Sequence, residues 1–217
     1  MDPLAIHPGT AHQLLQAMLI AWAAIEILLR LGNLGGRTAF DWTFGLVVAV
    51  VAAAINFGFR AAHVHSTVLG GGWVPVAVGL GVLAGGVALR TWAILTLGRL
   101  FKFVVVIQEG HRVVASGPYR LLRHPSYTGA LVAFLGTGIV LDSWLSTLAL
   151  VLIPLLAILV RIHVEEAELT NALGREYRTY ASRTRRLIPG LWERDGAPRA
   201  AGPGGRPVAW SSERRGG

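Results

Sequence analysis

Five apolar runs, each close to the length that crosses a lipid bilayer, constrain the fold of this chain more than any other feature of its sequence. They are residues Leu14–Leu31, Thr43–Phe59, Val74–Leu97, Tyr127–Leu141 and Leu145–Ile162. A helix needs about 20 mostly apolar residues to span the hydrocarbon core. Because backbone polar groups in lipid must be satisfied within the segment, we expect each run to be a helix. The sequence therefore predicts an all-α integral membrane protein with about five transmembrane helices.

Composition supports a membrane location and argues against a nucleic-acid partner. Apolar residues make up 53% of the chain and the mean hydropathy is +0.53, which is too apolar for an ordinary soluble domain. The net charge of +8 comes from basic residues between the apolar runs and after residue 160, where anionic membrane lipids account for it. The chain has no cysteine, so disulfides and thiolate metal sites are excluded.

The distribution of arginine predicts how the chain crosses the membrane. Segments 99–127 and 161–192 hold most of the arginines, and such loops face the cytoplasm. Five spans then place the N-terminus outside and the C-terminus in the cytoplasm, most simply of the plasma (inner) membrane. No Lys or Arg precedes the first apolar run, so we expect no cleaved signal peptide. The two arginine-rich segments therefore share one face, where they can build a site together.

The polar stretch Gly117–Gly129, with the sequence GPYRLLRHPSYTG, is the most unusual part of the chain. A Gly-Pro pair marks a turn, and Pro125 disfavours a helical conformation at His124. We therefore expect a turn that leads into a helix with Pro125 near its first position. By composition alone this basic, tyrosine-containing stretch fits a headgroup anchor as well as a functional site.

Several polar residues and glycines lie inside the apolar runs. Glu26 and Arg30 are four residues apart and predict either an internal ion pair or a polar wall of a site. Arg90 and Thr91 are expected to approach the next polar layer. Gly81 and Gly85 form a GxxxG pattern, which lets helices approach closely in lipid. His63 and His65 form an HxH pair with no third ligand nearby, which indicates a solvated loop, and we predict no metal site.

The end of the last apolar run carries a group of charges on one helical face. At about 100° per residue, Arg161, Glu165 and Glu168 lie close together around the helix, whereas His163 and Glu166 point elsewhere. Such a face can be an ordinary helix-end ion pair or part of a ligand site. The helix is expected to continue to about Leu173, with Gly174 as its C-cap.

Three blocks resemble the isoprenylcysteine carboxyl methyltransferase family, which is similar to the phospholipid methyltransferases. The first runs from His111 to Gly129 and includes RHPSYTG, the second is RxxxEE from Arg161 to Glu166, and the third runs from Gly174 to Pro189. The resemblance covers about residues 98–192. It implies an integral membrane enzyme that uses S-adenosyl-L-methionine to methylate a lipophilic or lipidated acceptor, and a cytoplasmic cofactor site.

The same resemblance implies roles for individual residues. Arg161 is tied to the substrate and is the candidate catalytic residue. Eukaryotic members place a glutamine contact shortly before the His111 position, where this chain has Gln108. The implied cofactor-binding residues are His111, Arg112, Val113, Val114, Tyr119, His124, Pro125, Ser126, Tyr127 and Glu165. Apart from the resemblance, Tyr177, Tyr180, Arg183 and Arg186 are expected either to fold the C-terminal segment over the site or to lie on anionic headgroups.

The resemblance leaves several functions open. The acceptor is expected to be the carboxylate of an isoprenylcysteine-like compound, with an amine headgroup as an alternative. Sterol-type membrane reductases share a similar GPYR and RHP pattern and use a nicotinamide cofactor, although RHPSYTG and RxxxEE favour methyl transfer. We divide the chain into three N-terminal helices (1–97), a methyltransferase core (98–192) and a disordered tail (193–217).

Overall fold

A computed structural model describes residues 8–32, 42–62, 72–98 and 113–187, and in these residues every regular element is helical. The elements are α1 (Pro8–Gly32), α2 (Trp42–Ala61), α3 (Trp73–Leu97), the short 3-10 helix η3 (Gly117–Arg120), α4 (Pro125–Val140) and α5 (Trp144–Ala181). Each predicted apolar run is a helix, so the predicted all-α class is confirmed. The expected tail lies outside the described residues.

Length and hydropathy identify the helices that can cross a membrane. Three candidate spans, Thr10–Leu29, Trp73–Leu97 and the 38-residue α5, are long and apolar enough, while Gly45–Ala61 and Pro125–Val140 are shorter apolar helices. Large apolar side chains also face outward from the bundle: Leu156 is 68% exposed and Leu28 is 67% exposed. Such faces are unfavourable in water and suit hydrocarbon. The protein is therefore a multi-pass membrane protein.

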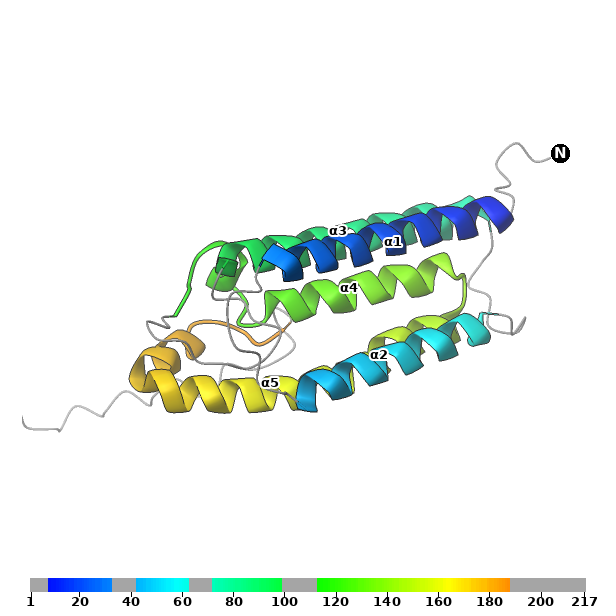
Figure 1. Ribbon diagram of the computed structural model, residues 1–217. Helices are drawn as coiled ribbons and strands as arrows, with labels where there is room; N and C mark the ends of the chain where they lie inside the picture. Colours follow the sequence, from blue (N-terminus) through cyan, green and yellow to red (C-terminus); the bar gives the residue numbers. More distant parts are fainter. Residues whose placement is uncertain (1–7, 33–41, 63–71, 99–112, 188–217) are drawn as a thin grey trace, which may run out of the picture.

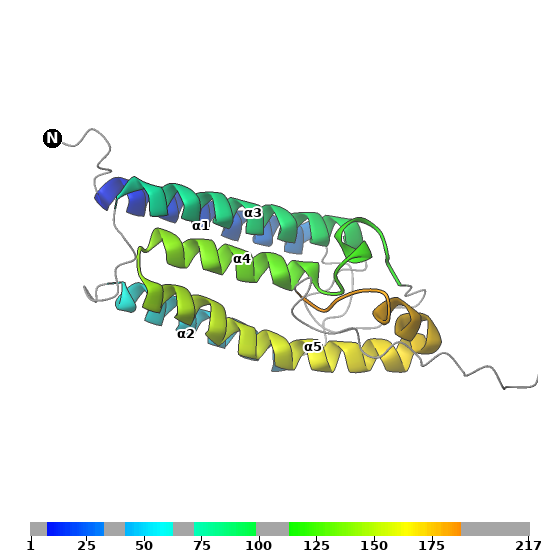
Figure 2. The same cartoon turned by 180° about the vertical axis from the view of Figure 1, so that it is seen from behind.

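The helices run alternately up and down an elongated bundle. Figures 1 and 2 show α1 and α3 side by side, α4 beneath them, and α2 and α5 on the opposite side of α4. The C-terminal end of α3, the start of α4 and the end of α5 consequently meet at one end of the molecule. The short turn between α4 and α5 lies at the other end, where Ser143 caps α5 by accepting a hydrogen bond from the backbone N–H of Ser146 (3.2 Å).

Glycines allow the backbones of α3 and α4 to touch. A Cβ atom at Gly86 would overlap the backbone nitrogen of Ala133, and one at Gly136 would overlap the backbone nitrogen of Leu83. Gly79 and Gly129 face the partner backbone in the same way, so the contact repeats every seven residues on both helices. A Cβ at Gly81 or Gly85 would meet nothing within 4 Å. The expectation that these two glycines form the close contact is therefore wrong.

Helix α5 has a break near its end that turns its last residues back toward the bundle. Gly174 has φ 54° and ψ −117°, so the regular helix ends before it and a second helical segment follows. A positive φ of this size is costly for residues with a side chain and is readily adopted by glycine. The predicted helix end at Gly174 is confirmed, and the second segment, which continues to Ala181, was not predicted.

Candidate functional site

The turn between Pro118 and Pro125 has the backbone conformation that the sequence predicts. Gly117 has φ 54° and begins η3, and Pro125 is the first residue of α4. His124 precedes it with a non-helical backbone (φ −125°, ψ 56°). The rings of His124 and Tyr127 are stacked, with centroids 5.7 Å apart and planes 25° apart. The turn therefore places two stacked aromatic rings at the end of the bundle.

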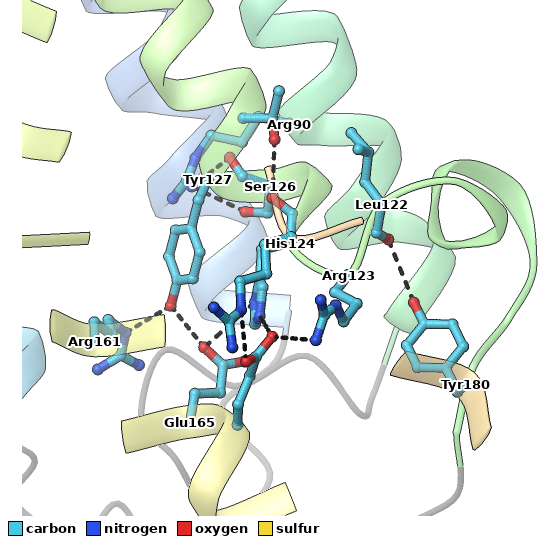
Figure 3. A network of polar contacts seen from close by, with 12 residues as sticks. Arg90, Leu122, Arg123, His124, Ser126, Tyr127, Arg161, Glu165 and Tyr180 are labelled. Carbon is cyan, nitrogen blue, oxygen red and sulfur yellow. Dashed lines mark hydrogen bonds and ion pairs between the residues drawn. The ribbon is translucent and has the colours of Figure 1, made fainter. Parts of the chain in front are cut away.

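A chain of hydrogen bonds joins this turn to α5. The Tyr127 hydroxyl donates to the Glu165 carboxylate (3.0 Å) and accepts a hydrogen bond from Nε of Arg161 (2.6 Å). Arg161 is only 3% exposed. Figure 3 shows Tyr127 between the two charged side chains. The predicted pair on one face of α5 is thus bridged by a residue from α4, and the exposed Glu168 stands apart from it.

Glu166 is the centre of a second set of contacts. Its carboxylate pairs with Nη1 of Arg123 (3.0 Å), accepts from Nε of Arg186 (2.9 Å) and lies 3.2 Å from Nε2 of His124. Its side chain is buried and charged, so these donors compensate the loss of water. As expected, Glu166 points away from the face of Arg161, and it nevertheless joins the network, because its partners lie on its own side of the helix. Glu166 lies about 140° around the helix from Arg161, and the returning C-terminal segment supplies a second set of partners on that side.

The C-terminal segment folds back along the turn, as expected from its tyrosines and arginines. Leu122 and Arg185 form a parallel bridge, with hydrogen bonds from Arg123 N to Arg185 O (2.6 Å) and from Arg185 N to Leu121 O (3.0 Å). The Tyr180 hydroxyl donates to the carbonyl oxygens of Tyr119 (2.9 Å) and Leu122 (3.3 Å), as Figure 3 shows for Leu122. Residues 180–187 therefore hold the turn in place.

Arg90 from α3 belongs to the same network. Its Nη1 donates to the Oγ of Ser126 (2.9 Å) and to its carbonyl oxygen (3.3 Å). Its Nε and Nη2 bind both carboxylate oxygens of Glu26 from α1. Glu26 was expected to face Arg30, whose side chain lies outside the described set. The position of Arg90 near the end of an apolar run predicted contact with a polar layer. Its partners could not be predicted, because they are far away in the sequence.

The remaining predicted residues lie around this network or outside the described part of the chain. Pro125 and Ser126 are buried, and Tyr119 is buried in η3, where desolvation raises the pKa of its phenol. Val113 and Val114 are half-buried, and Val113 N donates to Glu176 (3.4 Å). Gln108, His111, Arg112 and the pair His63 and His65 lie outside the described residues.

An open groove adjoins the network on the side of residue 113. It has a volume of about 870 Å³ and is lined on one side by Val113, Ala115 and Arg120. The opposite side is formed by residues 175–184 of the C-terminal segment, with Arg175, Glu176 and Tyr180 among them. The groove opens at the same end of the bundle as the stacked rings, which gives a water-soluble molecule a place to approach.

The carboxylates and the stacked rings of this network are groups that could bind a cationic or hydroxyl-bearing molecule. Two carboxylates can accept hydrogen bonds, and the stacked aromatic rings can attract a cation. Within the described ranges, no group of three His, Cys, Asp or Glu side chains could hold a metal ion. The prediction of no metal site stays a prediction, because the described residues cover only part of the chain.

Known proteins resemble this chain in sequence. A sequence model of the isoprenylcysteine carboxyl methyltransferase (ICMT) family matches residues 77–171. The chain is 37% identical over 119 residues to the probable protein-S-isoprenylcysteine O-methyltransferase of Oryza sativa subsp. indica, a match that covers 54% of this chain and 62% of the relative. It is 35% identical over 148 residues to the cobalt-zinc-cadmium resistance protein CzcN of Cupriavidus metallidurans, which covers 67% of this chain and 62% of that protein.

A solved structure of an isoprenylcysteine carboxyl methyltransferase also resembles this chain. The eukaryotic intramembrane Ras methyltransferase ICMT superposes with a TM-score of 0.55 at 28% identity, over 66% of this chain and 52% of that chain. The chain spans about three fifths of the length of the curated relatives named here. The matched region contains Arg90, the RHPSY turn, Arg161, Glu165 and Glu166. Residues 77–171 therefore carry the similarity of this chain to the isoprenylcysteine carboxyl methyltransferase family.

Proposed function

We propose that this protein transfers a methyl group from S-adenosyl-L-methionine to the carboxylate of a lipophilic, isoprenylcysteine-like acceptor. The observation that carries the proposal is the meeting of three distant blocks at one end of an apolar bundle. The turn at His124–Tyr127, the charges at Arg161–Glu166 and the segment at Tyr180–Arg186 are joined by hydrogen bonds there. The relatives named as isoprenylcysteine methyltransferases support the same activity.

The residues present fit the methyl donor. An acceptor oxygen would attack the methyl carbon of its positively charged sulfonium, and S-adenosylhomocysteine would leave with the electrons of the broken C–S bond. The stacked faces of His124 and Tyr127 suit a sulfonium, and Glu165, whose side chain is 29% exposed, can accept hydrogen bonds from hydroxyl or amino groups. Val113, Val114 and Tyr119 form the adjoining wall in this proposal. His111 and Arg112 stay proposed donor contacts that lie outside the described residues.

Arg161 fits the acceptor side of the reaction. Its Nε is bound by the Tyr127 hydroxyl, which fixes the plane of the guanidinium. The outer edge, with Nη1 and Nη2, has the geometry that binds a carboxylate through two parallel hydrogen bonds. A low-dielectric surrounding strengthens such contacts and limits access of water. Arg161 therefore orients the acceptor carboxylate, and an amine acceptor would leave it without this role.

The proposed site lies on the cytoplasmic face of the plasma (inner) membrane. The positive-inside distribution of arginine supports this orientation. A lipophilic acceptor can then move in from the bilayer, while the polar donor comes from the cytoplasm. In this proposal the methyltransferase core extends over residues 98–192, and membrane lipids are its surroundings.

Ligand binding by the detergent-purified protein tests the donor. We expect S-adenosylhomocysteine to bind and to raise the melting temperature, and NADPH to have no effect. Methyl transfer is then measured with an S-farnesylated cysteine derivative that has a free carboxylate, beside one in which an amine replaces the carboxylate. Binding of NADPH alone would favour a reductase, and methylation of only the amine compound would favour the amine-methylating alternative.

Two variants on α5 test the division of roles. Arg161→Met is expected to keep S-adenosylhomocysteine affinity and to lose methyl transfer, because only the acceptor contact is removed. Glu165→Gln is expected to weaken S-adenosylhomocysteine binding by about 1–3 kcal/mol, the cost of losing a charged hydrogen-bond acceptor. Titration and turnover are measured for both. The same profile for the two variants, whether unchanged or deficient in donor binding, would contradict the assignment.

A further inference from the structure

Helix α1 reaches the site through Glu26 although α1 lies outside the residues that match the family. The family match begins at residue 77. Glu26 binds Nε and Nη2 of Arg90 through both carboxylate oxygens, with Nη2 to Oε2 at 3.1 Å. Trp22, one turn earlier, donates its Nε1–H to Oε1 of Glu26 (3.1 Å). Two residues of α1 thus fix how the guanidinium of Arg90 is turned.

The remaining nitrogen of the same guanidinium holds the first turn of α4. Arg90 Nη1 donates to both oxygens of Ser126, the side-chain Oγ and the backbone carbonyl. Ser126 is 5% exposed. In the sequence it lies between His124 and Tyr127, whose rings stack on each other. Figure 3 shows Arg90 above Ser126, with Tyr127 beside them. A shift of Arg90 would therefore be passed to the residues that face the ligand.

Placing two charged side chains inside the bundle costs free energy, so a contact between them without a role would be selected against. The side chains of Arg90 and Glu26 are 15% and 19% exposed, and both lie within helices that can span the membrane. Charged residues inside membrane helices are expensive, usually paired, and often mark functional sites. A bidentate pair also fixes orientation more tightly than a single contact does.

We infer that Glu26 and Arg90 are positioning residues that hold Ser126 and thereby set how His124 and Tyr127 face the methyl donor. This inference rests on the proposed function, because the donor is the ligand whose affinity reports it. Neither residue needs to touch the donor. The N-terminal helix is then a working part of the site as well as a membrane span.

The competing explanation is that the pair only pins α1 against α3. That role predicts a loss of stability and no specific loss of ligand affinity. The side chain of Glu26 can be replaced with almost no change of volume. Positioning of the site and attachment of α1 to α3 can therefore be tested separately. Glu26→Gln keeps the shape and removes the charge, Glu26→Asp keeps the charge, and Ser126→Ala removes the hydroxyl that Arg90 binds.

A double-mutant cycle with S-adenosylhomocysteine as the probe tests the inference. We expect Glu26→Gln and Ser126→Ala each to weaken binding, by up to roughly tenfold for the loss of hydrogen bonds to a charged group. The variant with both substitutions should bind S-adenosylhomocysteine only slightly less tightly than the single variant that binds less tightly, because both changes act on the same contact. Glu26→Asp should recover part of the affinity. Arg60→Met serves as control, since Arg60 bonds Asn56 at the far end of the bundle.

A charge exchange gives a second measurement. The combined Glu26→Arg and Arg90→Glu variant can restore an ion pair between α1 and α3 but cannot donate to the Ser126 carbonyl. We expect a melting temperature close to that of the wild type and weak S-adenosylhomocysteine binding. Recovery of both would show that the pair only pins the helices and would overturn the inference.

The outcomes separate this inference from the proposed function. Normal wild-type binding with independent, multiplicative effects of Glu26→Gln and Ser126→Ala contradicts the inference alone. Unchanged affinity in Glu26→Gln does the same. Failure of the wild-type protein to bind S-adenosylhomocysteine contradicts the proposed donor, and the inference fails with it.

Discussion

At the scale of single residues, two tyrosines of the C-terminal segment differ sharply in how their hydroxyls are satisfied. Tyr180 donates to two backbone carbonyl oxygens of the turn, those of Tyr119 and Leu122. Tyr177 is 5% exposed, and its hydroxyl finds no hydrogen-bond partner in the part of the chain that the structure describes. Their rings are neighbours, with centroids 6.1 Å apart. The pair therefore offers a matched comparison of a bonded and an unbonded phenol.

Replacement of each tyrosine by phenylalanine should affect stability differently. Tyr180→Phe removes two bonds that fasten the C-terminal segment, and we expect the free energy of unfolding to fall by about 1–3 kcal/mol because buried acceptors are left unsatisfied. Tyr177→Phe removes a hydroxyl that gains nothing from burial, so stability should hold or rise slightly. Thermal unfolding in detergent without ligand measures both. A larger loss in Tyr177→Phe than in Tyr180→Phe would contradict this account.

At the scale of elements, the contact between α3 and α4 positions the site. Arg90 lies one turn beyond Gly86 on α3, and Ser126 lies just before Gly129 on α4. Gly129 packs against the backbone of Arg90 itself. The glycine repeat therefore fixes how far along α4 the guanidinium reaches. Close backbone approach of this kind replaces the hydrophobic driving force, which is weak between helices in lipid.

A single methyl group added at this contact should be harmful, while the same change on the open face of α3 should not. Gly86→Ala forces Cβ against the backbone of Ala133, and overpacking of this kind costs about 1–3 kcal/mol. Gly81→Ala meets open space and is expected to leave stability unchanged or slightly raised. The check is the melting temperature of both variants, with S-adenosylhomocysteine affinity as a readout of the site. Equal losses would show that both faces of α3 are packed.

At the scale of the whole molecule, the alternating direction of five helices brings the site together. Residues 113–124 and 165–187 are separated by α4 and most of α5, yet they lie at the same end of the bundle (Figure 1). The opposite end holds the turn between α4 and α5, with Asp142 at φ 52°. A membrane orientation that places one of these ends in the cytoplasm decides which compartment supplies the donor.

The arginine distribution predicts that the end with the site is cytoplasmic. A reporter that is active only in the cytoplasm, fused after Trp192, should be active, and one inserted between residues 63 and 71 should be inactive. The second fusion serves as control because α2 ends and α3 begins at the opposite end of the bundle. Activity of only the 63–71 fusion would invert the orientation and would sink the proposed cytoplasmic donor site.

The sequence by itself determined the helices and the identity of the main site blocks. Membrane-length apolar runs leave the backbone few alternatives to helix, so the five predicted helices appear with bounds close to those expected. The turn before Pro125 and the break at Gly174 follow from local backbone chemistry. The RHPSY and RxxxEE blocks were recognisable because their residues are close together in the chain.

Only the tertiary structure decided which residues meet across the bundle. Glu26 and Arg90 are 64 residues apart, and a helical wheel carries no information about which neighbour a face meets. Glu166 lies on a different face of its helix from Arg161, and only the contacts with Arg186 and Arg123 show that it belongs to the network. Gly79 and Gly86, rather than the more familiar Gly81 and Gly85, touch α4, because the partner's shape selects among the glycines. Contacts between distant segments arise from packing, and packing depends on all of the helices together.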